Sequence, residues 1–257
     1  MKNALLAGLA VATLLLAAAV YVSQGKQTPD FNLARLTADE KIALRGEIRA
    51  YLLDNPEVIF EAVDIAESRQ AEAQAQQDVT MVQVNAAAIF DDGYSWIGGN
   101  PEGDITLVEF VDYRCGYCRR AHDDVAQLVK SDGNIKLIMK EFPILGEDSM
   151  RSSQFAIAVK QLAGDASYKA AHDALITMRT SANEVSLSRL ATTLGLDAEQ
   201  VLAHMNSEEV RTEIANTRAL AQRLQITGTP TFVMQDELLR GYVPLQAMQQ
   251  LVAQKRG

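Results

Sequence analysis

Cys115 and Cys118 are the only cysteines of the chain, and two residues separate them. At the start of a helix this spacing brings the second sulfur within bonding distance of the first, because it lies one turn further on. The first sulfur would face the unpaired N–H groups and the positive end of the helix dipole, which lower the pKa of a thiol. A thiolate attacks disulfides and also leaves easily. The spacing therefore predicts a redox-active pair in which Cys115 forms a mixed disulfide with a substrate and Cys118 resolves it.

The same two residues allow three other hypotheses. A static bridge would close so short a loop that it would restrict the unfolded chain very little. A Cu(I)-binding module would use both thiolates as soft ligands, although no methionine stands beside the pair and the sequence shows no other ligand cluster. A non-catalytic protein-binding module would need neither thiol. For the exchange hypothesis we expect no cofactor and no metal site.

A strand and a helix must hold the pair at their junction. Residues 105–111 are rich in β-branched and aromatic side chains and predict a buried strand, while residues 119–129 have helical character. From Val79 onward the pattern favours short strand-like runs, with a loop at Gly98-Gly99. The later elements are expected to be a strand at 135–142, an almost wholly helical region at 149–224 with breaks near Gly164, Ser181 and Gly195, strands at 231–234 and 238–242, and a terminal helix. This order predicts an α/β fold.

Several stretches around the pair carry a family resemblance. They are Leu-Val-Glu-Phe at 107–110, Cys-Gly-Tyr-Cys at 115–118, Lys-Glu-Phe-Pro at 140–143, the long helical insert, and Gly-Thr-Pro-Thr-Phe at 228–232. Together they resemble the DsbA-like branch of the thioredoxin superfamily over residues 86 to 256. The resemblance implies an α/β thioredoxin fold with an inserted helical domain and an N-terminal helical extension. The thioredoxin-fold domain would comprise residues 86–148 and 225–257, and the inserted domain residues 149–224.

The resemblance also implies a role for each site residue. Cys115 is the attacking cysteine and Cys118 the resolving one. Pro230 falls on the cis-proline of the family, and Thr229 precedes it, so that both would bind an extended substrate. Glu109 matches the buried acid of the family and could relay the proton when Cys118 attacks. The alternative for Glu109 is a strand residue that faces solvent.

Gly116 and Tyr117 are the redox-tuning residues between the cysteines, together with Glu109. Strong oxidases of this family carry Pro-His at these two positions. Tyrosine cannot place a positive charge beside the thiolate, so we expect a milder oxidant than those enzymes. If residues 33–77 join protomers, several active sites would face one enclosed space, which suits an isomerase. The favoured interpretation of His122 is a lone surface histidine, and no chemical role is expected for the two other histidines, His172 and His204.

The N-terminal residues predict export. Residues 4–22 carry no charge and are nearly all Ala, Leu and Val, a length that fits both a cleaved signal peptide and a retained anchor. Residues 1–24 are therefore expected to be a signal peptide or membrane anchor. The protein would work in the periplasm, either soluble or anchored to the inner membrane by residues 4–22.

Residues 33–78 predict a helical region. Thr37 and Glu40 have the spacing of a capping box, and Asn55-Pro56 would start a second helix with Asn55 as its N-cap. The helix pair around residues 51–58 is similar to the N-terminal region of ScsC-type proteins (suppressor of copper sensitivity). Its apolar stripe either lies on a solvated connecting helix or binds a second copy of the chain, so a homo-oligomer through residues 33–77 is possible.

The composition of the chain excludes some classes of partner and of site. The chain has 257 residues, with 24 Lys and Arg against 33 Asp and Glu, and a net charge of −9, which argues against nucleic acid. Two cysteines exclude a disulfide scaffold and a four-sulfur zinc site.

Taken together, the cysteine pair, the family resemblance and the export signal predict an enzyme, a periplasmic thiol-disulfide oxidoreductase. Its partners would be cysteine-containing exported proteins and a membrane redox partner that recycles the cysteine pair.

Overall fold

The chain divides into an N-terminal helical unit and a second unit that contains the buried core. The computed structural model describes residues 33–257, and the chain separates into two units, Met1–Glu67 and Ser68–Gly257. The predicted signal or anchor at residues 1–24 lies outside the described residues. Among the helices from residue 33 onward, none is long and apolar enough to cross a membrane.

Helices make up the described part of the first unit. They are η1 (Leu33–Arg35), α2 (Ala38–Asp54) and the first part of α3 (Glu57–Val84). The predicted capping box is confirmed, because Thr37 Oγ1 accepts from the Glu40 N–H at 3.3 Å and the Thr37 N–H donates to Glu40 Oε2 at 2.8 Å. The break at Asn55-Pro56 is also confirmed. Asn55, however, donates its side-chain amide to the Tyr51 carbonyl at 2.9 Å, and so it closes α2 rather than capping α3.

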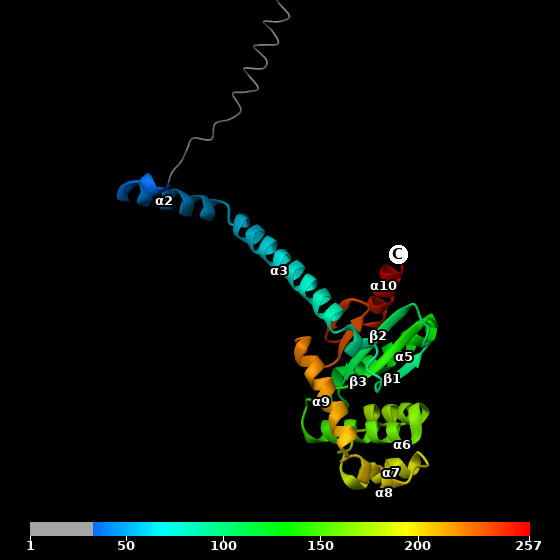
Figure 1. Cartoon of the computed structure of the whole chain (residues 1–257). Coiled ribbons are helices and arrows are strands. Elements are labelled where there is room, and N and C mark those ends of the chain that lie inside the picture. The colour runs from blue at the N-terminus through cyan, green and yellow to red at the C-terminus, as the bar shows by residue number, and fades with distance from the viewer. Residues whose placement is uncertain (1–32) are drawn as a thin grey trace, which may run out of the picture. The chain divides into compact units, whose positions relative to one another are not determined.

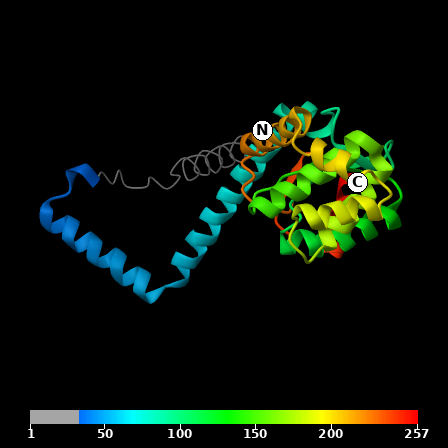
Figure 2. The same cartoon turned by 90° about the horizontal axis from the view of Figure 1, so that it is seen from below.

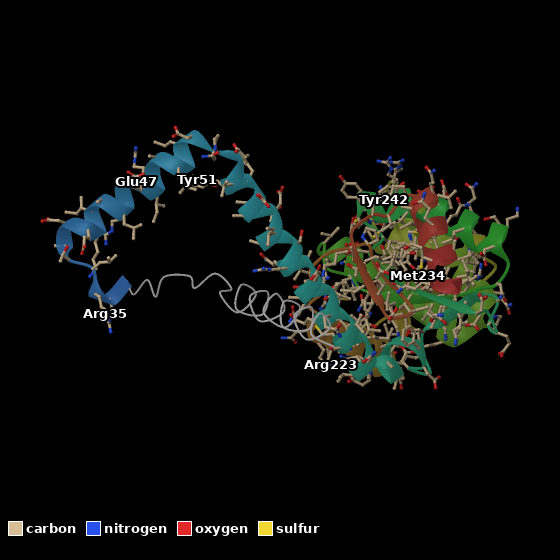
Figure 3. The ribbon with its side chains drawn as sticks, turned by 90° about the horizontal axis from the view of Figure 1, so that it is seen from above. Arg35, Glu47, Tyr51, Arg223, Met234 and Tyr242 are labelled. Atoms are coloured by element: carbon tan, nitrogen blue, oxygen red, sulfur yellow. The ribbon has the colours of Figure 1, made fainter. Side chains whose placement is uncertain are left out.

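Apolar side chains of this first unit are exposed. No residue of α2 is buried, and Figure 3 shows Tyr51 and Glu47 projecting from its ribbon. The large apolar residues with at least half of their surface exposed in this unit are Ile42, Ile48, Tyr51, Leu53, Ile59 and Phe60.

The strand-like pattern expected from Val79 is wrong, because α3 continues to Val84 and α4 follows at Ala86–Phe90. Packing overrides the β-branched composition here, since Val82 and Ile89 are buried in an apolar cluster with Val108. Asp78, one turn before Val82, forms a bidentate ion pair with Arg240, with N···O distances of 2.5 and 2.9 Å. These contacts hold the end of α3 against the sheet.

Five strands form one mixed sheet in the order β1-β3-β2-β4-β5. Their bounds are Trp96–Gly99, Ile105–Val111, Ile135–Glu141, Thr231–Met234 and Glu237–Arg240 for β1 to β5. Strands β2 and β3 are parallel, and the other pairs are antiparallel. All of these strands except β1 match the predicted ones to within two residues.

The loop expected at Gly98-Gly99 is instead the edge strand β1, paired with β3. Glycine is needed at positions 98 and 99 because neighbouring atoms leave no room for a Cβ atom. A Cβ on Gly98 would overlap the Trp96 ring at 2.1 Å, and one on Gly99, whose φ is +67°, would meet the Ile135 carbonyl oxygen at 2.3 Å. Composition alone could not distinguish this close packing from a turn.

Helices cover the sheet and fill the insertion between β3 and β4. They are α5 (Gly116–Asp132), α6 (Glu147–Thr177), α7 (Glu184–Thr193), α8 (Ala198–His204) and α9 (Glu208–Arg223), with α10 (Leu245–Arg256) at the C-terminus. The predicted break at Gly164 is confirmed by its non-helical φ of 80° within α6. Figures 1 and 2 show α6, α7 and α8 gathered together, with α9 leading back toward the sheet. The predicted α/β order is therefore confirmed.

Successive side chains of β2 alternate between two buried clusters. Leu107 and Val111 lie in one cluster with Cys115 and Cys118, whereas Val108 and Phe110 lie in the other. Glu109 shares the parity of Leu107 and Val111. Its side chain therefore faces the cluster that holds both cysteines.

Candidate active site

The two cysteines lie where the structure passes from β2 to α5. Cys115 is the N-cap residue of α5, and Cys118 lies in its first turn. Both are free thiols, with 7% and 1% of their surface exposed. The preceding loop is held by Asp112, whose carboxylate accepts from Ser149 Oγ at 2.7 Å and from the N–H groups of Ile144 and Leu145 at 2.8 and 3.0 Å. The first thiol is thus presented on a fixed turn.

The pair is electrostatically asymmetric. The pKa of the Cys115 thiol is lowered to about 5, first by the hydrogen bond from the Cys118 thiol and then by the Thr229 side chain and nearby N–H groups of α5. The pKa of Cys118 is raised by the same hydrogen bond, by burial and by the charge of Glu109. At neutral pH the pair therefore consists of a thiolate at Cys115 and a thiol at Cys118, which suits the predicted roles of attack and resolution.

Thr229 and Pro230 lie beside this thiolate. The Thr229–Pro230 peptide bond is cis, as the resemblance implied. Cys115 Sγ lies 3.1 Å from the Thr229 carbonyl oxygen, and the Gly241 N–H donates to the Pro230 carbonyl at 2.9 Å. The fold thus places the loop at residues 229–230 beside the cysteine pair, although more than a hundred residues separate them in the sequence.

Glu109 is buried, with 3% of its surface exposed, so the solvent-facing alternative is wrong. Its pKa is raised to about 8, mainly by burial and then by the charges of Cys115 and Glu141. The side chain lines a cavity of about 250 Å³, with His122, Val125 and Met139 among its other walls. A carboxyl group with this pKa can hold or release a proton near neutral pH.

Tyr117, between the two cysteines, lies at the surface. Its side chain is 61% exposed, and its ring stacks on Tyr242 with centroids 6.4 Å apart. Figure 3 shows Tyr242 at the surface of the second unit. Glycine at position 116 is exposed and meets no neighbouring atom within 4 Å of a built Cβ.

Positive charge does reach Cys115 from Arg119, one of two arginines beside the pair that the sequence interpretation missed. Arg119 interacts electrostatically with Cys115, and its Nη2 donates to the carbonyls of Tyr113 and Met178 at 3.3 and 3.0 Å. Arg114, directly before Cys115, donates to the same Met178 carbonyl at 3.3 Å. The signal was present in the sequence, because both arginines stand next to the cysteines.

His122 is not the lone surface histidine that we expected. Its ring lies 5.3 Å from the ring of His172, and its Nε2 is 3.4 Å from Asp173 Oδ1. One ligand atom from each of these three residues lies within 4.8 Å of the others. However, the Lys169 ammonium already binds Asp173, with Nζ 2.7 Å from Oδ1. Asp173 is thus shared between Lys169 and the two histidines.

A buried hydrogen-bond network supports the turn before the cysteines. Glu141 accepts from the hydroxyls of Tyr113 and Tyr168, both at 2.6 Å, and from Ser153 at 2.7 Å. The Tyr113 hydroxyl also lies 3.0 Å from Nδ1 of His172, a buried residue for which no role was expected. Burial raises the pKa of Glu141 to about 7 despite these hydrogen bonds. The network fixes Tyr113 two positions before the attacking cysteine.

A sheet of this topology, with a Cys-x-x-Cys pair at a helix start and a cis-proline loop beside it, is the arrangement of a thioredoxin-fold domain. The chain belongs to the DSBA-like thioredoxin domain family, which it matches over residues 106–253. Residues 40–73 match a second family, the copper resistance protein ScsC N-terminal domain. Both family resemblances stated from the sequence are therefore confirmed.

Solved structures agree with this assignment. A thioredoxin-like oxidoreductase from Silicibacter pomeroyi DSS-3 is 44% identical, with a TM-score of 0.63, and the match covers 67% of this chain and 98% of that one. The thiol-disulfide exchange protein alpha-DsbA2 from Wolbachia pipientis is 28% identical, with a TM-score of 0.66 over 71% and 98% of the two chains. Proteus mirabilis ScsC, at 24% identity and a TM-score of 0.63 over 87% and 98%, shares the fold.

Curated relatives include much longer proteins. The Na(+)/H(+) antiporter NhaA 1 of Salinispora arenicola (strain CNS-205) is 26% identical over 153 residues, which make up 59% of this chain and 23% of the antiporter. The matching region thus spans about a quarter of the length of that relative. The similarity reaches a part of the antiporter and carries no conclusion about ion transport.

Proposed function

We propose that this protein is a periplasmic thiol-disulfide oxidoreductase that exchanges disulfides with cysteines of exported proteins. The observation that carries the proposal is the unequal placement of two free thiols at the start of α5: Cys115 is the N-cap residue beside the cis Thr229–Pro230 loop, and Cys118 lies in the first turn, which agrees with a lowered pKa at Cys115 and a raised pKa at Cys118. A static bridge would need no such asymmetry. A two-coordinate Cu(I) site would use both thiolates as soft ligands, but no methionine stands beside the pair, so exchange is favoured over copper binding.

The exchange has two steps. The Cys115 thiolate attacks one sulfur of a substrate disulfide, forms a mixed disulfide and releases the other substrate sulfur as a thiolate. The Cys118 thiol then loses its proton and attacks Cys115 Sγ, which releases the second substrate thiolate and leaves the Cys115–Cys118 disulfide. Two electrons pass from the protein to the substrate. The reverse sequence oxidises a pair of substrate thiols.

Glu109 is the proposed acceptor of the Cys118 proton. The charge of the Cys115 thiolate is one cause of the raised pKa of Glu109. Formation of the mixed disulfide removes that charge, so the pKa of Glu109 should fall at the moment when a base is needed. The carboxylate then takes the proton of Cys118 within the buried cluster.

Thr229 and Pro230 are proposed to bind the extended substrate strand. This proposal rests on the position of the Thr229 carbonyl, 3.1 Å from Cys115 Sγ. A substrate whose backbone lies along this loop would bring its own cysteine sulfur to Cys115. The main-chain groups would supply affinity without selecting a particular sequence.

The direction of exchange is proposed to be that of an isomerase or mild oxidase, with a membrane redox partner that recycles the pair. Exposed apolar side chains on α2 and the start of α3 support assembly through residues 33–77. An assembly would place several active sites around one space, which suits isomerisation. Sedimentation of residues 25–257 should show an oligomer that is lost when residues 25–78 are removed, and a monomer in both cases would contradict this.

The periplasmic location is supported by the uncharged residues 4–22, whether they are cleaved or retained as an anchor. Fractionation of cells that express the tagged chain should place it outside the cytoplasm. Deletion of residues 1–24 should return it to the cytosolic fraction.

Insulin reduction and scrambled-ribonuclease refolding test the activity directly. We expect turnover in at least one assay, and we expect Cys115→Ser to abolish it. No turnover in either assay, or turnover that survives this substitution, would overturn the enzyme proposal. Copper titration of the reduced protein with Cys118→Ser as control would then distinguish the metal-binding alternative.

A further inference from the structure

Three arginines lie together around the Met178 carbonyl, at the end of α6. Arg114 and Arg119 both donate to the Met178 carbonyl, at 3.3 and 3.0 Å, although they come from opposite sides of the Cys-x-x-Cys motif. Arg179, the next residue after Met178, is exposed and interacts electrostatically with Arg119. Arg119 in turn interacts with Cys115. The end of α6 thus brings a third positive charge to the site from a distant part of the sequence.

Two of these guanidinium groups, those of Arg114 and Arg119, keep N–H donors without a hydrogen-bond acceptor in the part of the chain that the structure describes. Arg114 Nε and Nη2 and Arg119 Nε are buried without a hydrogen-bond partner within residues 33–257. Arg114 forms a long ion pair with Asp148, whose Oδ2 is 3.6 Å from Arg114 Nη2 and whose Oδ1 accepts from Ser181 at 2.8 Å. Arg119 donates only to backbone carbonyls. Unused donors of this fork-like kind match the two oxygens of a carboxylate.

We propose that Arg114, Arg119 and Arg179 form a carboxylate-recognition site that selects substrates with an acidic residue next to the reactive cysteine. The inference rests on the proposed function, because the anion would be carried by the chain bonded to Cys115. The net charge of the whole chain is −9, so acidic peptides would be repelled elsewhere on its surface. A local positive cluster at the sulfur therefore adds selectivity where binding must occur.

A series of synthetic peptides tests this selection on the unmodified protein. Three peptides of equal length carry one cysteine flanked by Glu, Gln or Lys, and each reduces the oxidised Cys115–Cys118 form. We expect the Glu peptide to react about fivefold faster than the Gln peptide, and the Lys peptide to be the slowest, as electrostatic complementarity acts mainly on association. The differences should shrink in 1 M salt, where the screening length falls to about 3 Å.

Variants identify the residues responsible. Arg179→Gln should reduce the preference for Glu over Gln without disturbing the fold, because this side chain is exposed. Arg119→Gln should abolish the preference. Lys130→Gln is the matched control, since it removes the same charge from an exposed position of α5 about 22 Å along the helix from Cys115. The control should keep the full preference.

The outcomes of these experiments distinguish a failure of the proposed recognition site from a failure of the proposed function. Equal rates for the three peptides, with exchange that depends on Cys115, would overturn the recognition site and leave the enzyme in place. Arg119→Gln slowing all three peptides equally would show that the arginine only stabilises the thiolate, which also overturns the site. Absence of exchange with every peptide, or exchange that persists in Cys115→Ser, would instead overturn the proposed function.

Discussion

Two helices of 17 residues each, α2 and α5, show opposite ways of building a helix. Helix α5 buries Cys118, Ala121, Val125 and Leu128 on one face, whereas α2 buries no residue. The buried positions of α5 follow the spacing of a single helix face, so tertiary packing stabilises it. Helix α2 depends on its capping box and on local propensity, and its apolar side chains remain exposed. The chemistry lies on the packed helix, where a thiol can be held at a fixed position.

The largest expected effect is the loss of the attacking thiol at the start of α5. Cys115→Ser should abolish insulin reduction, because a hydroxyl with its much higher pKa is no nucleophile for disulfides. Cys118→Ser should instead trap the mixed disulfide between Cys115 and the substrate, which mass spectrometry detects. Trapping by Cys115→Ser and loss of trapping by Cys118→Ser would reverse the assigned roles.

Stability measurements compare the buried face of α5 with the exposed side chains of α2. Leu128 is 1% exposed, and Leu128→Ala should lower the free energy of unfolding by ~2–5 kcal/mol, because it leaves a cavity in the core. Ile48 is 51% exposed, and Ile48→Ala should change it by no more than ~0.5 kcal/mol in dilute protein. Urea denaturation measures both.

The outcome for Ile48→Ala also bears on assembly. If residues 33–77 join protomers, the substitution should weaken the oligomer in sedimentation while leaving dilute-protein stability unchanged. Equal destabilisation by Leu128→Ala and Ile48→Ala at low concentration would show that α2 packs as α5 does. The contrast between the two helices would then be wrong.

Glu109→Gln tests the buried acid beneath α5. The substitution should slow the resolving step by roughly 10²-fold, since the amide cannot accept the Cys118 proton. Quenched-flow analysis should show accumulation of the mixed disulfide, with the first attack largely unchanged. An equal loss in both steps would indicate that Glu109 acts on the fold rather than on the proton.

Glu109 also predicts a pH dependence of stability for the reduced protein. Its pKa is raised from 4.5 to about 8 in the folded state, so its contribution is fully present below pH 4.5 and is lost as the pH rises through 8. In Glu109→Gln this part of the decline between pH 4.5 and 8 should be absent. Urea midpoints of both proteins across that range measure the difference, and parallel pH profiles would contradict the raised pKa.

Much of this site could be predicted from the sequence because its central residues are close together. Cys115 and Cys118 carry their chemistry in their spacing, and the strand and helix around them follow from hydrophobic periodicity. Arg114 and Arg119 stand beside the cysteines in the sequence, but Arg179 could not be added to them, because it reaches the site only through the end of α6. His122 and His172 likewise meet across two helices. Glu109 needed the family resemblance, since a single acidic residue in a strand does not reveal which face it takes.

The smallest expected effect concerns the cap of α2. Thr37→Ala removes the oxygen that accepts from the Glu40 N–H and should destabilise the helix by ~1 kcal/mol. Circular dichroism of a peptide spanning residues 33–54 should then show reduced helicity, and Thr37→Ser should restore it because serine caps equally well. In the full chain, at a concentration low enough to keep protomers apart, the global unfolding midpoint should not move, because no residue of α2 is buried within one chain. A shift of that midpoint comparable to the one caused by Leu128→Ala would mean that α2 is coupled to a packed interface, as an assembly through residues 33–77 requires.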